Sequence, residues 1–279
     1  MTRPPRSPSG EMPFLDHLEE LRVRILWSLG AVAVGALVGV WLTLQFGVME
    51  LLVRPIQPYL PNGKLIFTSP TEAFLVTFKV GLFLGVLLAL PVVCYQFWRF
   101  VAPGLLEKER RVFVPSVLAS LALFGLGAVL AFTLVIPVGL RFFLTFQQGA
   151  FQPFISVGQY LSFVMNMTLV FGLVFETPLV VLVLSYLGVL DPATLGKYRR
   201  HAVVAIAILS AFLTPSPDAL SMMLMFIPFY GLYEASVQTA LAIERRRRRA
   251  RAVADHRDPA AAGPPMLESE GAAPQPGES

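Results

Sequence analysis

Six apolar stretches, separated by polar segments, dominate the pattern of hydrophobic and polar positions along this chain. A helix needs about 20 residues at ~1.5 Å each to cross the ~30 Å hydrocarbon core of a bilayer. The stretches are Ile25–Phe46, Ala73–Phe97, Val112–Ile136, Val157–Leu187, His201–Leu213 and Ala219–Ile243. The pattern predicts an all-α, polytopic membrane protein with six transmembrane helices. The last two are expected to be short, because His201–Leu213 falls well below that length and Glu234 interrupts the sixth.

The fourth stretch, Val157–Leu187, carries a carboxylate deep inside an apolar run. Glu176 is followed two residues later by Pro178, which has no backbone N–H to donate and therefore bends a helix. A charge at this depth costs on the order of 3 kcal/mol or more, so such a residue normally faces other helices or trapped water. The pattern predicts a bent helix around which the other spans are organised.

Segments at the two ends of the chain differ from the apolar stretches. Residues 1–12 are rich in proline, serine and arginine and are expected to be disordered. The segment from Pro13 repeats Phe14, Leu18, Leu21 and Ile25 at helical spacing, which is typical of an amphipathic helix at the membrane surface. Glu20 and Arg24 form a favourable i, i+4 pair on it. We assign residues 13–244 to the transmembrane domain and residues 245–279 to a basic, then disordered, tail.

The distribution of charge predicts the orientation. The chain has 279 residues, of which 55% are hydrophobic and only 14% charged, as in a membrane protein. Of its 22 Lys and Arg, only Arg54, Lys64 and Arg141 lie in the connections on one side, and Lys79 lies within a span. Because basic connections stay in the cytoplasm, both termini are expected to be cytoplasmic, in the inner membrane.

Several classes of function are not supported. Cys94 is the only cysteine and the three histidines lie far apart in sequence, so we expect no disulfide and no metal site. No phosphate-binding loop or catalytic triad is evident, so we expect no cofactor and no enzymatic activity. The run Arg245–Arg249 is interpreted as a membrane-surface anchor, not as a nucleic-acid patch.

The connection Tyr95–Arg111 contains acids among aromatic and basic residues, and it has two interpretations. It is either an interfacial elbow in which Glu107 and Glu109 pair with neighbouring cations, or a carboxylate site for a cationic peptide. The second interpretation rests on the bidentate pairing of arginine with carboxylate, and Glu20 would supply a second acid.

These motifs, in this order, resemble those of the TatC family, the multi-spanning receptor subunits of the twin-arginine protein translocase. The resemblance extends from Met12 to about Glu244. It rests on His17-Leu18-Glu19-Glu20-Leu21-Arg22, Pro55, Tyr95–Pro103, Glu107–Arg111, Tyr160–Val164, Phe175-Glu176-Thr177-Pro178, Leu213-Thr214-Pro215 and Tyr233-Glu234. Each motif alone is weak, but together and in sequence they are very specific.

The resemblance implies a concave six-helix receptor for signal peptides that carry an arginine pair. It implies a binding site formed or supported by Glu20, Arg22, Phe100 and Glu109. It also implies an intramembrane glutamate at Glu176, TatA- and TatB-type single-span partners, several copies in the complex, and use of the proton-motive force.

The end of the chain shows one departure from the family pattern. Where the family often has Ser-Gln at the start of the last span, this chain has Ser221-Met222. We include Thr214, Ser221, Met222 and Glu234, with Glu176, as candidate polar or partner contacts within the membrane.

Two other functions remain open from the sequence alone. A proton-coupled transporter of small solutes would use Glu176 and Glu234 as a relay. Such transporters often contain two matching halves with broken helices, and no such halves are evident here. A structural scaffold would leave the buried acid Glu176 without a role.

Overall fold

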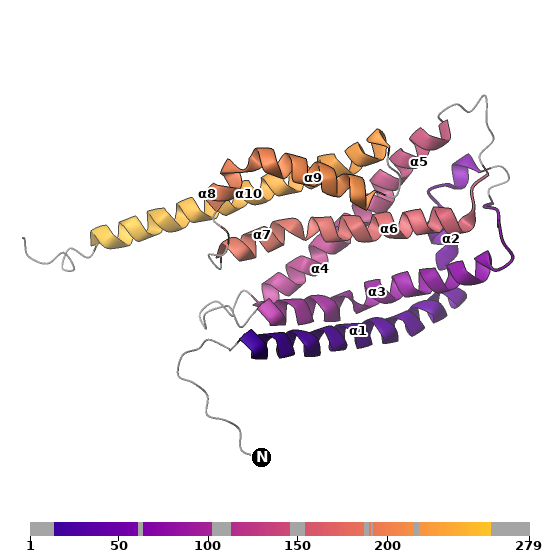
Figure 1. Cartoon of the computed structure of the whole chain (residues 1–279), viewed down its shortest axis with the longest axis horizontal. Coiled ribbons are helices and arrows are strands. Elements are labelled where there is room, and N and C mark those ends of the chain that lie inside the picture. The colour runs from indigo at the N-terminus through magenta and orange to yellow at the C-terminus, as the bar shows by residue number, and fades with distance from the viewer. Residues whose placement is uncertain are drawn as a thin grey trace, which may run out of the picture.

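The computed structural model is a bundle of long helices that run roughly along one axis (Figure 1). It describes residues 14–60, 64–101, 113–145, 154–186, 190, 192–214 and 218–257. The elements are α1 (Phe14–Gln45), α2 (Val48–Val53), η1 (Gln57–Tyr59), α3 (Glu72–Val101), α4 (Phe113–Leu130), the π-helical turn η5 (Ala131–Val135), α5 (Ile136–Thr145), α6 (Val157–Phe175), α7 (Thr177–Tyr186), α8 (Pro192–Lys197), α9 (Arg199–Leu213) and α10 (Ala219–Arg257).

Five helical segments of the described chain are long and apolar enough to cross a membrane. They are Asp16–Gln45, Glu72–Val101, Phe113–Thr145, Val157–Ser185 and Ala219–Arg246. They correspond to the first four and the sixth of the predicted stretches. The predicted fifth stretch forms α9, whose 15 residues are too few to qualify by length. The structure is therefore helical and multi-spanning as predicted, with five spans by this measure.

The fourth span lies at the centre of the bundle. Half of its most apolar window is buried, against 11% for the first span. The predicted break is confirmed, because α6 ends at Phe175 and α7 begins at Thr177. At the break, the Glu176 amide donates to the Leu173 carbonyl at 3.1 Å, a tighter turn than an α-helix makes. Pro178 explains the break, since it has no N–H with which to continue the hydrogen-bond ladder.

The first span packs on α3, and the two lie side by side in Figure 1. The contact is made by two glycine pairs at i, i+4 spacing, which the sequence analysis did not use. A Cβ on Gly39 would lie 2.1 Å from the Gly81 carbonyl oxygen, and one on Gly35 would lie 2.5 Å from that of Gly85. The backbones therefore approach as closely as small residues allow, the usual way in which helices associate in membranes.

Two helices extend beyond their predicted ends. The third span continues past Ile136 to Thr145. The π-helical turn η5 precedes Pro137, and the α-helix resumes as α5 directly after this turn. The last helix continues through the basic run to Arg257, where the sequence predicted a change to a disordered tail. Alanine and arginine are strong helix formers, so a helix that begins in the span can propagate through them. Residues 1–12 and 258–279 of the predicted tails lie outside the described residues.

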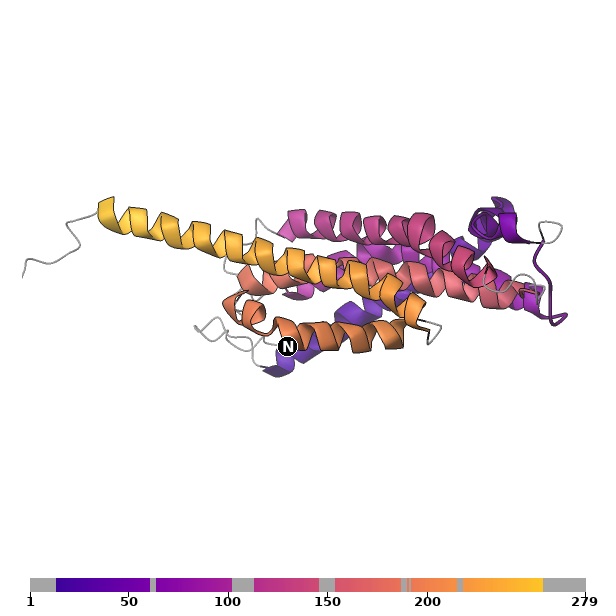
Figure 2. The same cartoon turned by 90° about the horizontal axis from the view of Figure 1, so that it is seen from above.

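The two ends of the bundle are formed by different elements (Figure 1). The start of α1 and the end of α10 lie at the same end, and α10 projects beyond the other helices there (Figures 1 and 2). The short helix α2 and the start of α6 lie at the opposite end (Figure 1). The end of α9 and the start of α10 stop short of that opposite end in both views.

Candidate functional site

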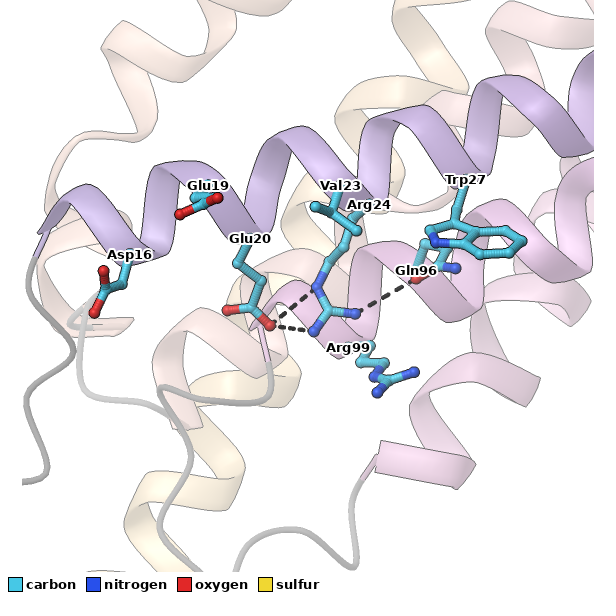
Figure 3. A pocket seen from close by; sticks show the side chains of 8 residues that line it. All are labelled: Asp16, Glu19, Glu20, Val23, Arg24, Trp27, Gln96 and Arg99. Carbon is cyan, nitrogen blue, oxygen red and sulfur yellow. Dashed lines mark hydrogen bonds and ion pairs between the residues drawn. The ribbon is translucent and has the colours of Figure 1, made fainter. Parts of the chain in front are cut away.

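A pocket of about 690 Å³ opens between the first turns of α1 and the last turns of α3. Figure 3 shows the eight side chains that line it, six from α1 and two from α3. They are Asp16, Glu19, Glu20, Val23, Arg24, Trp27, Gln96 and Arg99. Three of them are acids, so the pocket offers several carboxylates next to an aromatic ring. We call it the Glu20 pocket.

The Glu20 carboxylate is held on one side only. Arg24 donates from Nε to Glu20 Oε1 at 3.1 Å and also donates to the same oxygen from its terminal nitrogen, which confirms the predicted pair. Arg24 also reaches Gln96 on α3, at 3.4 Å from the amide oxygen, and so links the two helices (Figure 3). Glu20 Oε2 is buried and accepts no hydrogen bond from the residues that the structure describes. A buried oxygen of this kind favours the arrival of another donor.

Beside the pocket, the His17 ring stacks on Phe100 with ring centroids 4.3 Å apart and an angle of 14° between the planes. His17 Nδ1 lies 3.8 Å from Glu20 Oε2, an ion pair only when the imidazole is protonated. The structure thus brings together Glu20 and Phe100, two predicted site residues that are far apart in sequence.

Two other predicted site residues are not in this group. Arg22 is exposed on α1 and does not line the pocket. Glu109 lies outside the described residues, in the segment between α3 and α4. That segment begins directly after Val101, the last residue of α3 and the residue after Phe100.

Glu176 lies at the break between α6 and α7 and is partly buried. Ser120 on α4 donates its hydroxyl to Glu176 Oε2 at 2.6 Å. The second oxygen, Oε1, is buried and has no hydrogen-bond partner in the described part of the chain. Glu20 and Glu176 therefore each have one oxygen that is held by a side chain and one oxygen without a described donor.

Glu234 on α10 is held through one oxygen, and its other oxygen, Oε2, also has no hydrogen-bond partner among the described residues. Its Oε1 lies 2.7 Å from the guanidinium of Arg199 at the start of α9 and also accepts from Gln238 at 2.8 Å. Nearby, the Tyr233 hydroxyl donates to the Leu195 carbonyl of α8 at 3.0 Å. Glu234 therefore joins α10 to α9, and Tyr233 joins α10 to α8. Among the described residues, no hydrogen bond or ion pair joins Glu234 to Glu176, as a relay would require.

The remaining candidates surround the turn between α9 and α10. Thr214 is buried, and its hydroxyl donates to the Ser210 carbonyl at 2.9 Å. Ser221 is also buried, and its amide donates to the Asp218 carboxylate, which caps α10. Met222 is partly exposed. Of these three side chains, Met222 is the one available at the surface.

Sequence reasoning missed the partners of both intramembrane acids. Ser120 and Arg199 are ordinary residues in the sequence, and only the helix packing brings them to Glu176 and Glu234. The acids Asp16 and Glu19 are visible in the sequence, but their place in a pocket depends on the angle at which α1 meets α3. The described residues hold no group of three His, Cys, Asp or Glu side chains that could bind a metal ion.

Comparisons with known proteins agree with this architecture. The family model for "Sec-independent protein translocase protein (TatC)" matches residues 16–228. The chain is 39% identical to the TatC protein of Aquifex aeolicus, over 81% of this chain and 93% of that protein. It is 37% identical to that of Carboxydothermus hydrogenoformans, over 84% and 94%. A crystal structure described as the twin arginine translocase receptor TatC superposes with a TM-score of 0.73 at 38% identity, covering 81% of this chain and 98% of that one.

Proposed function

Because the chain belongs to the TatC family of Sec-independent protein translocase proteins, we propose that it is a signal-peptide receptor whose Glu20 pocket binds an arginine pair. As a TatC protein it is a multi-pass membrane component of the twin-arginine translocase, not an enzyme. The observation that carries the receptor proposal is the Glu20 carboxylate in an acid-lined pocket, with Oε1 held by Arg24 and Oε2 without a hydrogen bond among the described residues.

The chemistry of the pocket suits a guanidinium group. Arginine donates two parallel hydrogen bonds to a carboxylate and also stacks on aromatic rings, and the pocket offers Glu20 and Trp27. Asp16 and Glu19 add negative charge at the mouth. In our proposal Glu109 supplies the carboxylate for the second arginine, Phe100 forms an apolar wall, and Arg22 supports the site from outside the pocket.

We predict that Glu20→Gln and Glu109→Gln each weaken binding of a twin-arginine peptide by about tenfold or more. A hydrogen bond to a charged group contributes roughly 1.5–3 kcal/mol, which corresponds to that loss. The measurement is fluorescence anisotropy of a labelled signal peptide on the purified full-length chain. The same peptide with its arginines replaced by lysines gives the reference for lost bidentate contacts.

Two controls separate binding from folding. Glu20→Gln leaves Arg24 without its carboxylate, so the double variant Glu20→Gln/Arg24→Gln tests the same loss without an unpaired cation. Glu50→Gln removes one exposed acid from α2, outside the Glu20 pocket, and should bind the peptide as the wild type does. Equal affinity of the wild type and both Glu20 variants would show that the pocket is an interfacial elbow.

We also propose that the chain lies in the inner membrane with both termini in the cytoplasm. The helix ends that carry Arg22, Arg99 and Arg199 lie at one end of the bundle (Figure 1), whereas Arg54 and Lys64 line a pocket with α2 and the first turns of α3 and α6 at the other end. This separation follows the rule that basic connections remain cytoplasmic. In this arrangement α9 makes a sixth crossing, about 22 Å long at ~1.5 Å per residue, through a locally thinned bilayer.

Thiol labelling tests this orientation. In a Cys94→Ser background, Lys64→Cys should react with an impermeant thiol reagent in intact cells, whereas Lys197→Cys should react only after the cells are opened. Both lysines are exposed, so a difference between them reports the side of the membrane. Labelling of Lys197→Cys in intact cells would reverse the proposed orientation.

For partners, we propose TatA- and TatB-type single-span subunits that pack along the short α9–α10 edge. The complex would contain several copies of this chain, and the proton-motive force would drive export. The outer face of α9 supports this, because Val204, Ile208 and Phe212 are exposed. Met222 would contact the partner at the start of α10, while Thr214 and Ser221 form hydrogen bonds at the end of α9 and the start of α10. Glu176 would contribute its unpaired oxygen to a polar contact within the membrane.

A further inference from the structure

A second pocket, of about 610 Å³, lies at the opposite end of the bundle from the start of α1. Its walls come from α2, η1, the segment that leads into α3, and the first turns of α3 and α6. The lining includes the cations Arg54 and Lys64, the acid Glu50, and an apolar wall with Phe67, Val76 and Leu161. Neither the signal-peptide site nor the proposed partner contacts use any of these residues.

Hydrogen bonds fix the walls of this pocket to one another. The Tyr160 hydroxyl on α6 donates to the Leu52 carbonyl of α2 at 2.8 Å. The segment before α3 pairs with the start of α6, since the Ile66 amide donates to the Ile155 carbonyl and the Val157 amide donates to the Ile66 carbonyl. The pocket is therefore formed before any ligand arrives, which lowers the entropic cost of binding.

The acid next to these walls is fully engaged within the chain. Glu72 accepts hydrogen bonds from the Gly158 amide at 2.7 Å, from the Thr68 amide at 2.6 Å and hydroxyl at 2.8 Å, and from the Ser156 hydroxyl. It is thus committed to holding the start of α6 against the segment before α3. Within the described part of the chain, neither Arg54 nor Lys64 forms an ion pair, and both are exposed. The lining contains the two cations Arg54 and Lys64 and one carboxylate, that of Glu50, so it carries an excess of positive charge.

We propose that this pocket binds an anionic phospholipid from the adjoining leaflet, with its phosphate between Arg54 and Lys64 and an acyl chain along Phe67, Val76 and Leu161. Two parts of the wall are the first turns of α3 and α6, which begin two membrane spans, and this places the cations at the depth of lipid headgroups. Arginine and lysine are the usual ligands of phosphate, and the volume lies within the range of small-molecule sites. A single phosphodiester charge complements the excess positive charge, and the apolar wall requires a ligand that also carries hydrocarbon.

The test is a lipid titration of the purified full-length chain in detergent, read by native mass spectrometry with dioctanoyl phosphatidylglycerol as the probe. Arg54→Gln/Lys64→Gln should weaken its binding by about tenfold or more, since charged contacts to the phosphate are lost. The matched control is Lys79→Gln/Arg141→Gln, which removes two exposed cations that do not line the pocket. This control should bind the lipid as the wild type does.

Further probes separate a lipid from its parts. Dioctanoyl phosphatidylethanolamine should bind more weakly than phosphatidylglycerol, and glycerol 3-phosphate should not compete at equal concentration. Equal loss in both double variants, or full competition by glycerol 3-phosphate, would overturn the proposal. Peptide binding at the Glu20 pocket, measured on the same samples, reports the fold. If the wild-type chain binds the lipid but not the peptide, the receptor function is contradicted and the lipid proposal is not.

Discussion

Replacing Gly39 by leucine should abolish binding of a twin-arginine peptide, although Gly39 lies about 28 Å along α1 from Glu20 at ~1.5 Å per residue. A Cβ there would lie 2.1 Å from the Gly81 carbonyl oxygen and 2.8 Å from the Gly85 nitrogen. These are backbone atoms of α3 and cannot rotate away. The leucine must therefore push α1 away from α3.

The consequence reaches the pocket because α1 depends on α3 for its position. Only 11% of the most apolar window of α1 is buried, and its main packing partner is α3. The Glu20 pocket exists only while the two helices are docked, with Arg24 linked to Gln96 and His17 stacked on Phe100. Separation of the helices removes both contacts at once, so the expected loss of peptide binding exceeds that of Glu20→Gln.

Gly30→Leu is the matched control. Gly30 lies on the same helix, and a Cβ on it would have no neighbouring atom within 4 Å. It should bind the peptide as the wild type does. Docking of the helices is measured separately, by a short bis-maleimide between His17→Cys and Phe100→Cys in a Cys94→Ser background. Gly39→Leu should lose this crosslink while the protein still inserts in the membrane. If Gly39→Leu keeps both the crosslink and the peptide affinity of Gly30→Leu, close packing of α1 on α3 does not support the site.

Local features of this fold were predictable from the sequence, because they depend on neighbouring residues. Pro178 removes a backbone donor wherever the helix lies, so the break at Glu176 follows from the sequence alone. The Glu20–Arg24 pair follows from i, i+4 spacing on one helix. The paired glycines at 35 and 39 and at 81 and 85 were equally visible, and their spacing could have predicted the contact of the first two spans.

Contacts between distant helices were not predictable in the same way. Ser120 and Glu176 are 56 residues apart, and their hydrogen bond depends on how α4 crosses α6 and α7. The same holds for Arg199 and Glu234, whose pairing ties α9 to α10. Hydropathy measures how apolar α9 is and not whether it reaches both surfaces. The predicted short fifth stretch forms a helix of 15 residues, which is below the length of the five long spans.

The second large effect is expected at Glu176, where Glu176→Ala should lose most export and most retention of a co-expressed single-span partner. Alanine removes the acceptor of the Ser120 hydroxyl and also the unpaired oxygen Oε1 that we assign to the partner contact. Glu176→Gln keeps the size and one carbonyl acceptor, so it should retain most of both activities. A proton relay predicts the opposite for this variant, because an amide cannot exchange a proton as a carboxyl does.

The hydrogen bond from Ser120 provides an independent test of the same idea. Ser120→Ala leaves both Glu176 oxygens without a donor, and an unsatisfied buried group costs about 1–3 kcal/mol. Without this hydrogen bond the carboxylate is no longer held in the orientation that presents Oε1 to the partner, so we expect Ser120→Ala to weaken partner retention by about tenfold. Ser116→Ala is the matched control, because Ser116 is equally buried one turn earlier on α4 and does not bond to Glu176. Retention of the partner is measured by co-purification, with peptide binding at the Glu20 pocket as the check of the fold. Wild-type retention in Ser120→Ala together with Glu176→Gln as damaging as Glu176→Ala would identify Glu176 as a proton-carrying group instead of a contact.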